Sequence, residues 1–118
     1  MSRRIALATL LALAALGSTA ATARAPVSLG VAEREFHITP YAKSVKHGRV
    51  KFNIDNLGQD THNLVVRGPH HFKAHGPDVQ AGERATFTVN FRRKGTYTLL
   101  CTRANHYKLG MKATLKVR

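Results

Sequence analysis

Three residues near the C-terminal end of the chain, Cys101, His106 and Met111, carry side chains that bind soft metal ions, and they are spaced as C-x4-H-x4-M. Cys101 is the only cysteine, and Met111 is the only methionine apart from the first residue. Soft sulfur ligands select Cu(I), and imidazole also suits copper. A thiolate, a thioether and an imidazole in one short segment therefore predict a copper site capable of one-electron redox chemistry.

A mononuclear site of this kind needs a further ligand from outside the segment. The best candidate is His62, which follows a turn and precedes the apolar run Leu64-Val65-Val66. We expect Cys101 to end one strand and Met111 to begin the next, so that strand pairing brings the ends of the ligand loop together at low entropic cost. His62 would reach the loop only in the folded protein.

Each of these residues also has an ordinary structural interpretation. A lone cysteine or methionine is usually an apolar core residue, and a histidine before a strand is usually a surface residue. Zinc could use the cysteine and two histidines, but it has no use for the Met111 thioether. Nothing in the sequence indicates an oxyanion site beside the cysteine, so we expect a binding protein and no enzyme.

The elements that must position these ligands are predicted to be strands. Apolar and polar residues alternate in several short segments, and no segment keeps a helical period. The clearest examples are residues 27–31, 50–54, 85–91 and 111–118. Turn signals such as His47-Gly48 and Lys94-Gly95 separate them. We expect an all-β fold, a Greek-key β-sandwich or barrel of six to eight strands. Residues 68–77, bracketed by two Gly-Pro pairs, are predicted to form a long loop.

The N-terminal residues resemble a secretory signal peptide. Arg3 and Arg4 precede an apolar run, and small residues follow it up to Ala23. The run is shorter than the roughly 20 residues that a membrane span requires. We therefore expect residues 1–23 to be a signal peptide cleaved after Ala23, residues 24–118 to form one domain, and the protein to be periplasmic or secreted. An uncleaved anchor is the alternative, and the paired arginines leave Sec and twin-arginine export both open.

The 118 residues carry a formal net charge of +13, and only two of the cations lie in the predicted signal peptide. Such a charge favours an acidic partner or an anionic membrane surface, and the alternative is a solvated basic face without a partner. Nucleic acid is not expected, because the chain is predicted to be exported and has no nucleic-acid-binding motif. A monomer with an acidic redox partner is predicted, with Arg103, Tyr107 and Lys108 near the docking surface.

At these residues the sequence resembles the cupredoxins, the small type I blue-copper proteins. The resemblance covers the predicted domain. Its clearest parts are Val50-Lys51-Phe52, Asn56-x-Gly58, His62-Asn63-Leu64, Gly82-Glu83 with Phe87-Thr88-Val89, and the segment from Gly95-Thr96-Tyr97 to Cys101. It implies three equatorial ligands, His62, Cys101 and His106, with Met111 as a weak axial ligand. The loop spacing is closest to rusticyanin-like and sulfocyanin-like members.

The resemblance also implies an activity, that of a one-electron carrier between redox partners. It further implies that Asn63 ties the two ligand loops together, and that its backbone N–H donates to the Cys101 sulfur. One departure is that Asn105 and Tyr107 flank His106, where many members have a proline. The alternative function is a copper carrier or resistance protein without redox turnover. His70, His71 and His75 favour it, since they would suit either a weak second metal site or a solvated loop.

Overall fold

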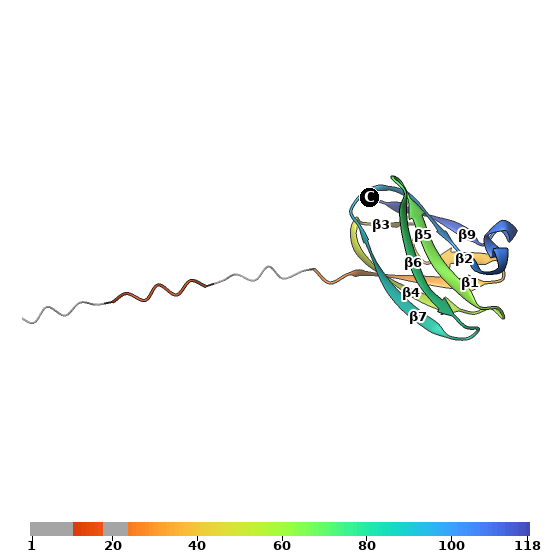
Figure 1. The fold of residues 1–118 in the computed structure, drawn as a ribbon, viewed down its shortest axis with the longest axis horizontal. Coiled ribbons are helices and arrows are strands. Elements are labelled where there is room, and N and C mark those ends of the chain that lie inside the picture. The colour runs from red at the N-terminus through yellow and green to blue at the C-terminus, as the bar shows by residue number, and fades with distance from the viewer. Residues whose placement is uncertain (1–10, 18–23) are drawn as a thin grey trace, which may run out of the picture.

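The structure is a computed structural model that describes residues 11–17 and 24–118. Most of the predicted signal peptide, including the cleavage site at Ala23, lies outside the described residues. Within them, nine strands and one 3-10 helix are formed (Figure 1). In chain order these are β1 Val27–Arg34, β2 His37–Pro40, β3 Ser44–Val45, β4 Gly48–Asn56, β5 His62–Gly68, β6 Phe72–Val79, β7 Arg84–Phe91, β8 Gly95–Leu100, η1 Arg103–Leu109 and β9 Lys112–Val117.

The strands form two sheets that enclose one core. One sheet has the order β2-β1-β4-β7 and the other has the order β3-β9-β8-β5-β6. β1 pairs with β4 and β3 pairs with β9 in parallel, whereas all other described pairs are antiparallel. This two-sheet sandwich confirms the predicted fold class. The described residues contain one strand more than the predicted six to eight, because the short β2 and β3 add to the longer strands.

Side chains of both sheets meet in the core as their alternation predicts. In β4, Val50, Phe52 and Ile54 are at most 1% exposed, while their neighbours point outwards. Leu115 and Val117 of β9 are buried in the same way. Aromatic rings fill the centre, with the Phe91 and Tyr97 rings 4.7 Å apart and edge to face. The Tyr97 hydroxyl donates a hydrogen bond to the Arg93 carbonyl, which satisfies this polar group inside the core.

The prediction of a long loop over residues 68–77 was wrong, because most of this segment forms β6. Its two Gly-Pro pairs look like strand breakers, but the structure accommodates both. β6 is an edge strand, where the missing N–H of Pro77 leaves no sheet partner unsatisfied. A Cβ on Gly76 would come within 2.7 Å of the Phe87 ring and 2.8 Å of the Leu64 carbonyl. Gly76 thus permits close packing inside a strand.

The sandwich has two functionally distinct ends. Figure 1 shows η1 at one end, with the entering N-terminal segment and the C-terminus at the other. We call the first the ligand end, because His62 begins β5 and Cys101 follows β8 there. The residues of the N-terminal segment that the structure describes, 11–17, form neither helix nor strand. Among the described residues, no helix has the length and apolar character that would let it cross a membrane.

Candidate metal centre

Three of the predicted ligands meet at the ligand end. The Cys101 sulfur lies 3.9 Å from Nδ1 of His62 and 3.6 Å from Nδ1 of His106. The two Nδ1 atoms are 3.2 Å apart. All three residues are buried, and one atom from each lies within 4.8 Å of the others. The structure therefore brings together residues 39 and 44 positions apart, as the sequence predicted.

The partners of the two imidazoles indicate which nitrogen of each ring is free to bind a metal. Nε2 of His62 lies 3.2 Å from Oε1 of Glu35, and Nε2 of His106 lies 3.4 Å from Oδ2 of Asp60. The Glu35 carboxylate accepts a hydrogen bond from His62 Nε2–H, which assigns the proton of this ring to Nε2. The negative charge of Asp60 beside Nε2 of His106 favours the same tautomer there. Both Nδ1 atoms are then unprotonated and lie close to one another and to the sulfur, an arrangement that a metal cation between them would stabilise.

The separations of the three ligand atoms match the size of a bound transition metal. With a metal–nitrogen distance of about 2.0 Å and a metal–sulfur distance of about 2.3 Å, an ideal trigonal plane has edges of about 3.5 Å between nitrogens and about 3.7 Å from nitrogen to sulfur. The observed edges of 3.2, 3.6 and 3.9 Å lie close to these values. A trigonal His2Cys set is the equatorial arrangement of blue-copper sites.

The ligand loop folds around His106 through an unusual local conformation. Ala104 and Asn105 both have positive φ angles, 45° and 58°, inside η1, and Gly110 ends η1 at φ 101°. These turns let the chain leave β8, point His106 inwards and return to β9 within a few residues. The His106 carbonyl accepts a hydrogen bond from the Met111 N–H at 3.2 Å, and the Cys101 N–H donates to the Met111 carbonyl at 3.1 Å. The predicted hairpin-like loop is thus a 3-10 turn closed by backbone hydrogen bonds.

Asn63 joins the two ligand regions as expected. Its Nδ2 donates to Thr102 Oγ1 at 2.9 Å, and its Oδ1 accepts from the Thr102 N–H at 2.8 Å. Burial raises the pKa of the Cys101 thiol, whereas the backbone N–H groups of Asn63 and Arg103 lower it by donating to the sulfur. These two donors would stabilise the thiolate that a metal binds.

Met111 completes the predicted set from the end of the loop. Its side chain is fully buried, and its backbone is bonded to both Cys101 and His106. It precedes β9 by one residue, so the prediction that it begins the strand is close to the structure. Met111 and Cys101 belong to the same buried cluster of core residues.

Glu35 is the main support of His62 and was missed by sequence reasoning. Its Oε1 accepts hydrogen bonds from the backbone N–H groups of Gln59 and Asp60, both at 2.7 Å, besides the contact with His62. The Asp60 N–H has the largest effect on the carboxyl group, and together these donors lower the Glu35 pKa to about 2. Glu35 therefore carries a negative charge next to the site, while burial lowers the pKa of His62 itself.

Sequence reasoning also missed Phe36 and Asp60, which cover His106. The Phe36 ring packs edge-on against the His106 ring, with centroids 5.3 Å apart. The His106 side chain is 6% exposed and that of His62 is 0% exposed, so His106 is the ligand nearer to solvent. Asp60 stands only two residues before His62, which is the one local signal that could have identified it.

Glu33 is a third acidic residue near the ligands, but unlike Glu35 and Asp60 it is fully buried, and neither of its carboxyl oxygens has a hydrogen-bond partner among the described residues. Desolvation raises its pKa to about 8, so the side chain is protonated at neutral pH. Glu33 lies on the same inward face of β1 as Leu29 and Val31. This spacing of every second residue could have predicted from the sequence that Glu33 is buried.

Replacing Glu33 by glutamine is expected to flatten the dependence of stability on pH. The folded protein holds the Glu33 proton up to about pH 8, whereas the unfolded chain releases it near pH 4.5. Stability in the wild type therefore falls as pH rises through this window, by on the order of 3 to 5 kcal/mol. Urea unfolding of the metal-free protein across the window measures this slope. Glu83→Gln, an exposed acidic position, is the control; an equal slope in wild type and Glu33→Gln would contradict the prediction.

The other histidines do not join a metal site in the part of the chain that the structure describes. His70 and His71 occupy the turn between β5 and β6, at the end opposite the ligands, and His75 is exposed on β6. A helical turn would have placed His71 and His75 on one face, but the segment is a turn followed by a strand. Within residues 11–17 and 24–118, the only group of three or more metal-binding side chains is that of His62, Cys101 and His106.

Fold and site together define a β-sandwich protein whose described residues form one type I copper site. Residues 25–118 match the family model of copper binding proteins, plastocyanin/azurin family, and the chain belongs to this family. No curated protein matches the sequence significantly.

The similar solved structures include auracyanins and multicopper oxidases. Auracyanin from Roseiflexus castenholzii has 21% identity and a TM-score of 0.65, with 80% of this chain and 99% of that chain covered. Auracyanin A from Chloroflexus aurantiacus has 19% identity and a TM-score of 0.63, with 80% and 100% covered. A multicopper oxidase has 12% identity and a TM-score of 0.63, and only 45% of its chain is covered. At these identities the likeness establishes the fold.

Proposed function

We propose that the protein is an exported carrier of single electrons. His62, Cys101 and His106 would hold one copper ion, and Met111 would supply a fourth, thioether ligand. Copper, when bound, supplies the Cu(I)/Cu(II) couple. The observation that carries this proposal is the convergence of two imidazole nitrogens and one cysteine sulfur at separations of 3.2 to 3.9 Å, all on buried residues.

The surrounding protein keeps the ligands in place when the charge of the site changes. His62 begins β5, Cys101 directly follows the paired strand β8, and hydrogen bonds between Asn63 and Thr102 connect the two segments. The Glu35 carboxylate accepts a hydrogen bond from the Nε2–H of His62, and the Asp60 carboxylate lies 3.4 Å from Nε2 of His106. Ligands held by so many contacts cannot rearrange far between oxidation states, and this favours fast electron transfer over release of the ion.

His106 is the proposed exit for electrons, because it is the copper-binding imidazole nearest to solvent. Around the ligand end, Leu109 is 59% exposed, Leu57 is 44% exposed and Tyr107 is 37% exposed. Exposed apolar residues beside a redox centre suit transient contact with a redox partner protein. Arg103, which was predicted to face an acidic partner, already forms an ion pair with Asp78 at 3.2 Å.

The alternative of a copper carrier loses its main support in the structure. His70 and His71, which favoured it, lie at the end opposite the ligands and cannot pass an ion to them. Export and cleavage after Ala23 remain part of the proposal and rest on the sequence of residues 1–23. The rusticyanin-like or sulfocyanin-like assignment rests only on the spacing of the ligand loop, since the similar structures reported above include auracyanins.

Addition of Cu(II) to the protein tests the function directly. The expected result is an intense visible thiolate-to-copper band with narrow copper hyperfine splitting in the EPR spectrum. The colour should disappear on reduction and return on reoxidation without loss of copper. A colourless protein would refute the site, and a coloured protein that releases its copper on reduction would favour the carrier.

Replacing Met111 by leucine is expected to retain the colour and raise the reduction potential. The thioether donates weakly to copper, and the axial ligand tunes the potential of such sites. Leucine has a similar volume in this buried position and should cost less than about 1.5 kcal/mol of stability. Redox titration followed by absorption measures the shift. An unchanged or lower potential would argue against Met111 as a ligand.

A further inference from the structure

The charges of this protein are separated along the long axis of the sandwich. All six acidic residues in the sequence lie at the ligand end or on the loops and strand ends next to it. Asp55 lies one residue before the end of β4 and pairs with Arg84, and Asp78 pairs with Asn63 near the start of β5. The remaining four are Glu33, Glu35, Asp60 and Glu83. The large positive net charge is therefore concentrated away from the ligands.

The opposite end carries exposed cations from both sheets. The turns and strand ends that meet there are fixed by the pairs Gly48↔Phe91, Arg67↔Lys73 and Gly95↔Val117. We call this surface the basic end, and its exposed cationic residues are Lys46, Arg49, Arg67, Lys73, Arg92, Arg93, Lys94, Lys116 and Arg118. Because no aspartate or glutamate lies among them, each adds to a single field of one sign.

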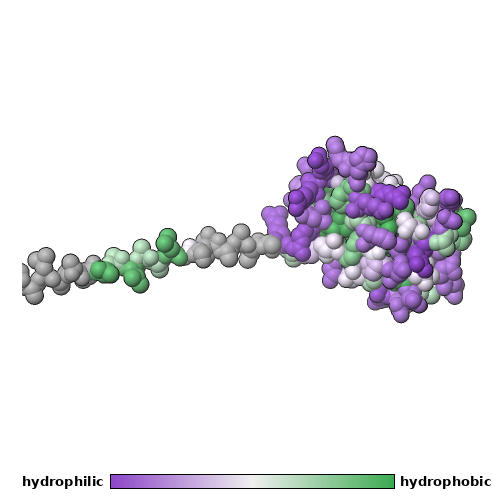
Figure 2. Space-filling model, viewed as in Figure 1, coloured by the Kyte–Doolittle hydropathy of each residue, from purple (hydrophilic) through white to green (hydrophobic). Residues whose placement is uncertain are grey.

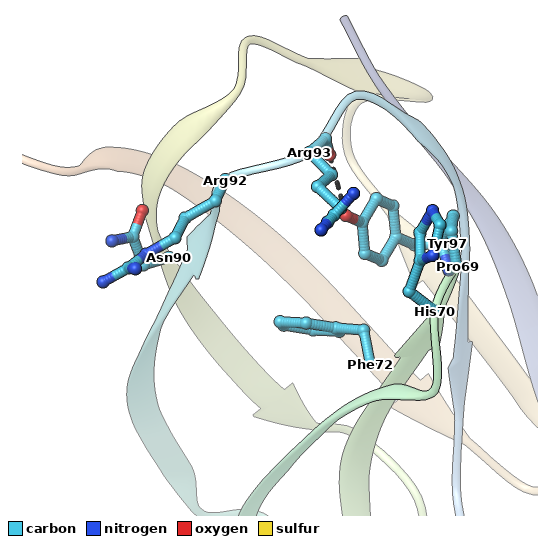
Figure 3. A pocket seen from close by; sticks show the side chains of 7 residues that line it. All are labelled: Pro69, His70, Phe72, Asn90, Arg92, Arg93 and Tyr97. Carbon is cyan, nitrogen blue, oxygen red and sulfur yellow. Dashed lines mark hydrogen bonds between the residues drawn. The ribbon is translucent and has the colours of Figure 1, made fainter.

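A hollow of about 290 Å³ opens at the basic end. Figure 3 shows the side chain of Arg93 above the Phe72 ring, with Tyr97 on one side and Asn90 and Arg92 on the other. His70 and Pro69 complete its wall. Guanidinium groups beside aromatic rings suit a phosphate ester that carries an apolar group. Arginine binds the phosphate in a bidentate manner, and the rings contact the apolar carbon atoms.

The N-terminal segment leaves the domain from this same end. Arg24, Ala25 and Val27 line a second hollow together with Lys46 and Arg49. Figure 2 shows hydrophilic residues around the point where the segment joins the domain. The segment itself contains the apolar run from Ile5 to Leu16. Whether or not this run is removed, the chain that preceded Arg24 was attached at the basic end.

We propose that the basic end docks on the surface of an anionic phospholipid membrane, with a lipid phosphate in the hollow beside Arg93. The ligand end then faces away from the lipid, where a redox partner reaches His106. This proposal depends on the placement of charge and does not require that the copper site work. In this proposal the positive charge of the basic end serves membrane attachment, and the surface around η1, which carries both acidic and basic residues, serves electron exchange.

The length of the sandwich makes this orientation selective. β4 spans most of the distance between the two ends, and nine residues at about 3.3 Å each extend roughly 30 Å. The field of an anionic surface fades within a Debye length of about 8 Å at physiological salt. Lipid therefore attracts the basic end strongly, while the acidic residues of the ligand end lie beyond its reach.

Vesicle binding by residues 24–118, which contain every described strand, tests the proposal. The vesicles are phosphatidylcholine with or without phosphatidylglycerol, at physiological salt. We expect binding only to the anionic vesicles. The variant R92Q/R93Q/K94Q should lose on the order of 100-fold in affinity, because each cation near an anionic surface contributes most of a tenfold factor. A second variant, K46Q/R49Q/R118Q, should lose a similar factor and covers the case in which the first fails to fold.

The matched control, R34Q/R84Q/K112Q, removes the same charge from the ligand end and should bind nearly as well as the wild type. Equal losses in all three variants would show that net charge alone acts, and would overturn the proposal. Absence of binding to anionic vesicles, or tighter binding to DNA or to an acidic protein than to vesicles, would overturn it too. Inorganic phosphate should compete no better than chloride at equal ionic strength; strong competition would assign the hollow to free phosphate.

Discussion

Replacing Cys101 by serine is expected to abolish the visible absorption band and to lower copper affinity by more than about 100-fold. This loss is larger than the roughly 10- to 100-fold range typical of removing a residue that only orients a metal ligand, because Cys101 is itself a proposed ligand. The band arises from the thiolate, and serine offers a hydroxyl that stays protonated at neutral pH and is a harder donor. The two imidazoles would remain, so weak Cu(II) binding should persist without colour. Absorption, EPR and competition with a chelator measure these effects.

Folding of the serine variant must be separated from loss of the ligand. Cys101 is fully buried, and a buried hydroxyl without a partner costs about 1 to 3 kcal/mol. The backbone N–H groups of Asn63 and Arg103, which donate to the sulfur, can donate to the serine oxygen instead. Urea unfolding without metal should therefore show a folded variant. Met111→Leu is the coloured control, and a serine variant that kept the band would exclude Cys101 as the ligand.

Strands were predictable from the sequence where only one of their two faces packs against the core. Val50, Phe52 and Ile54 alternate with polar residues because β4 is buried on one face, and this pattern is visible in sequence. Gly76 and Pro77 hid β6, because their usual effect is to end a strand. Only the position of β6 at the edge of its sheet and its close contact with β5 make them acceptable, and both depend on the tertiary fold.

The metal ligands were predictable because soft donors are rare in this chain. A single cysteine at a fixed distance from a histidine and a methionine leaves few interpretations. The carboxylates that hold the histidines were not predictable, because Glu35 reaches His62 from 27 positions away across the fold. Net charge could likewise be counted from composition, but its separation into a basic end and a mixed ligand end requires the strand register.

Replacing Glu35 by alanine is expected to weaken copper binding by about 10- to 100-fold, the range for residues that orient a metal-binding histidine. The loss has two parts. The His62 Nε2–H loses its acceptor, so the ring is free to rotate, and the N–H groups of Gln59 and Asp60 lose theirs, so the loop before His62 loosens. Chelator competition measures the affinity, and hydrogen exchange of the Gln59 and Asp60 amides measures the loop.

Glu35→Gln separates charge from hydrogen bonding at the same site. Its amide oxygen can still accept from the loop and from His62, so the affinity loss should be smaller than for alanine. Removing a negative charge beside the site destabilises Cu(II) relative to Cu(I), so the reduction potential should rise. Asp60→Asn is the comparison. Asp60 is 53% exposed and contacts His106 at 3.4 Å, so solvent should reduce the effect of its charge on the potential.

If Glu35→Ala bound copper as tightly as the wild type, strand pairing alone would hold His62. A potential that rose more in Asp60→Asn than in Glu35→Gln would instead make the carboxylate beside the exposed ligand the one that tunes the site.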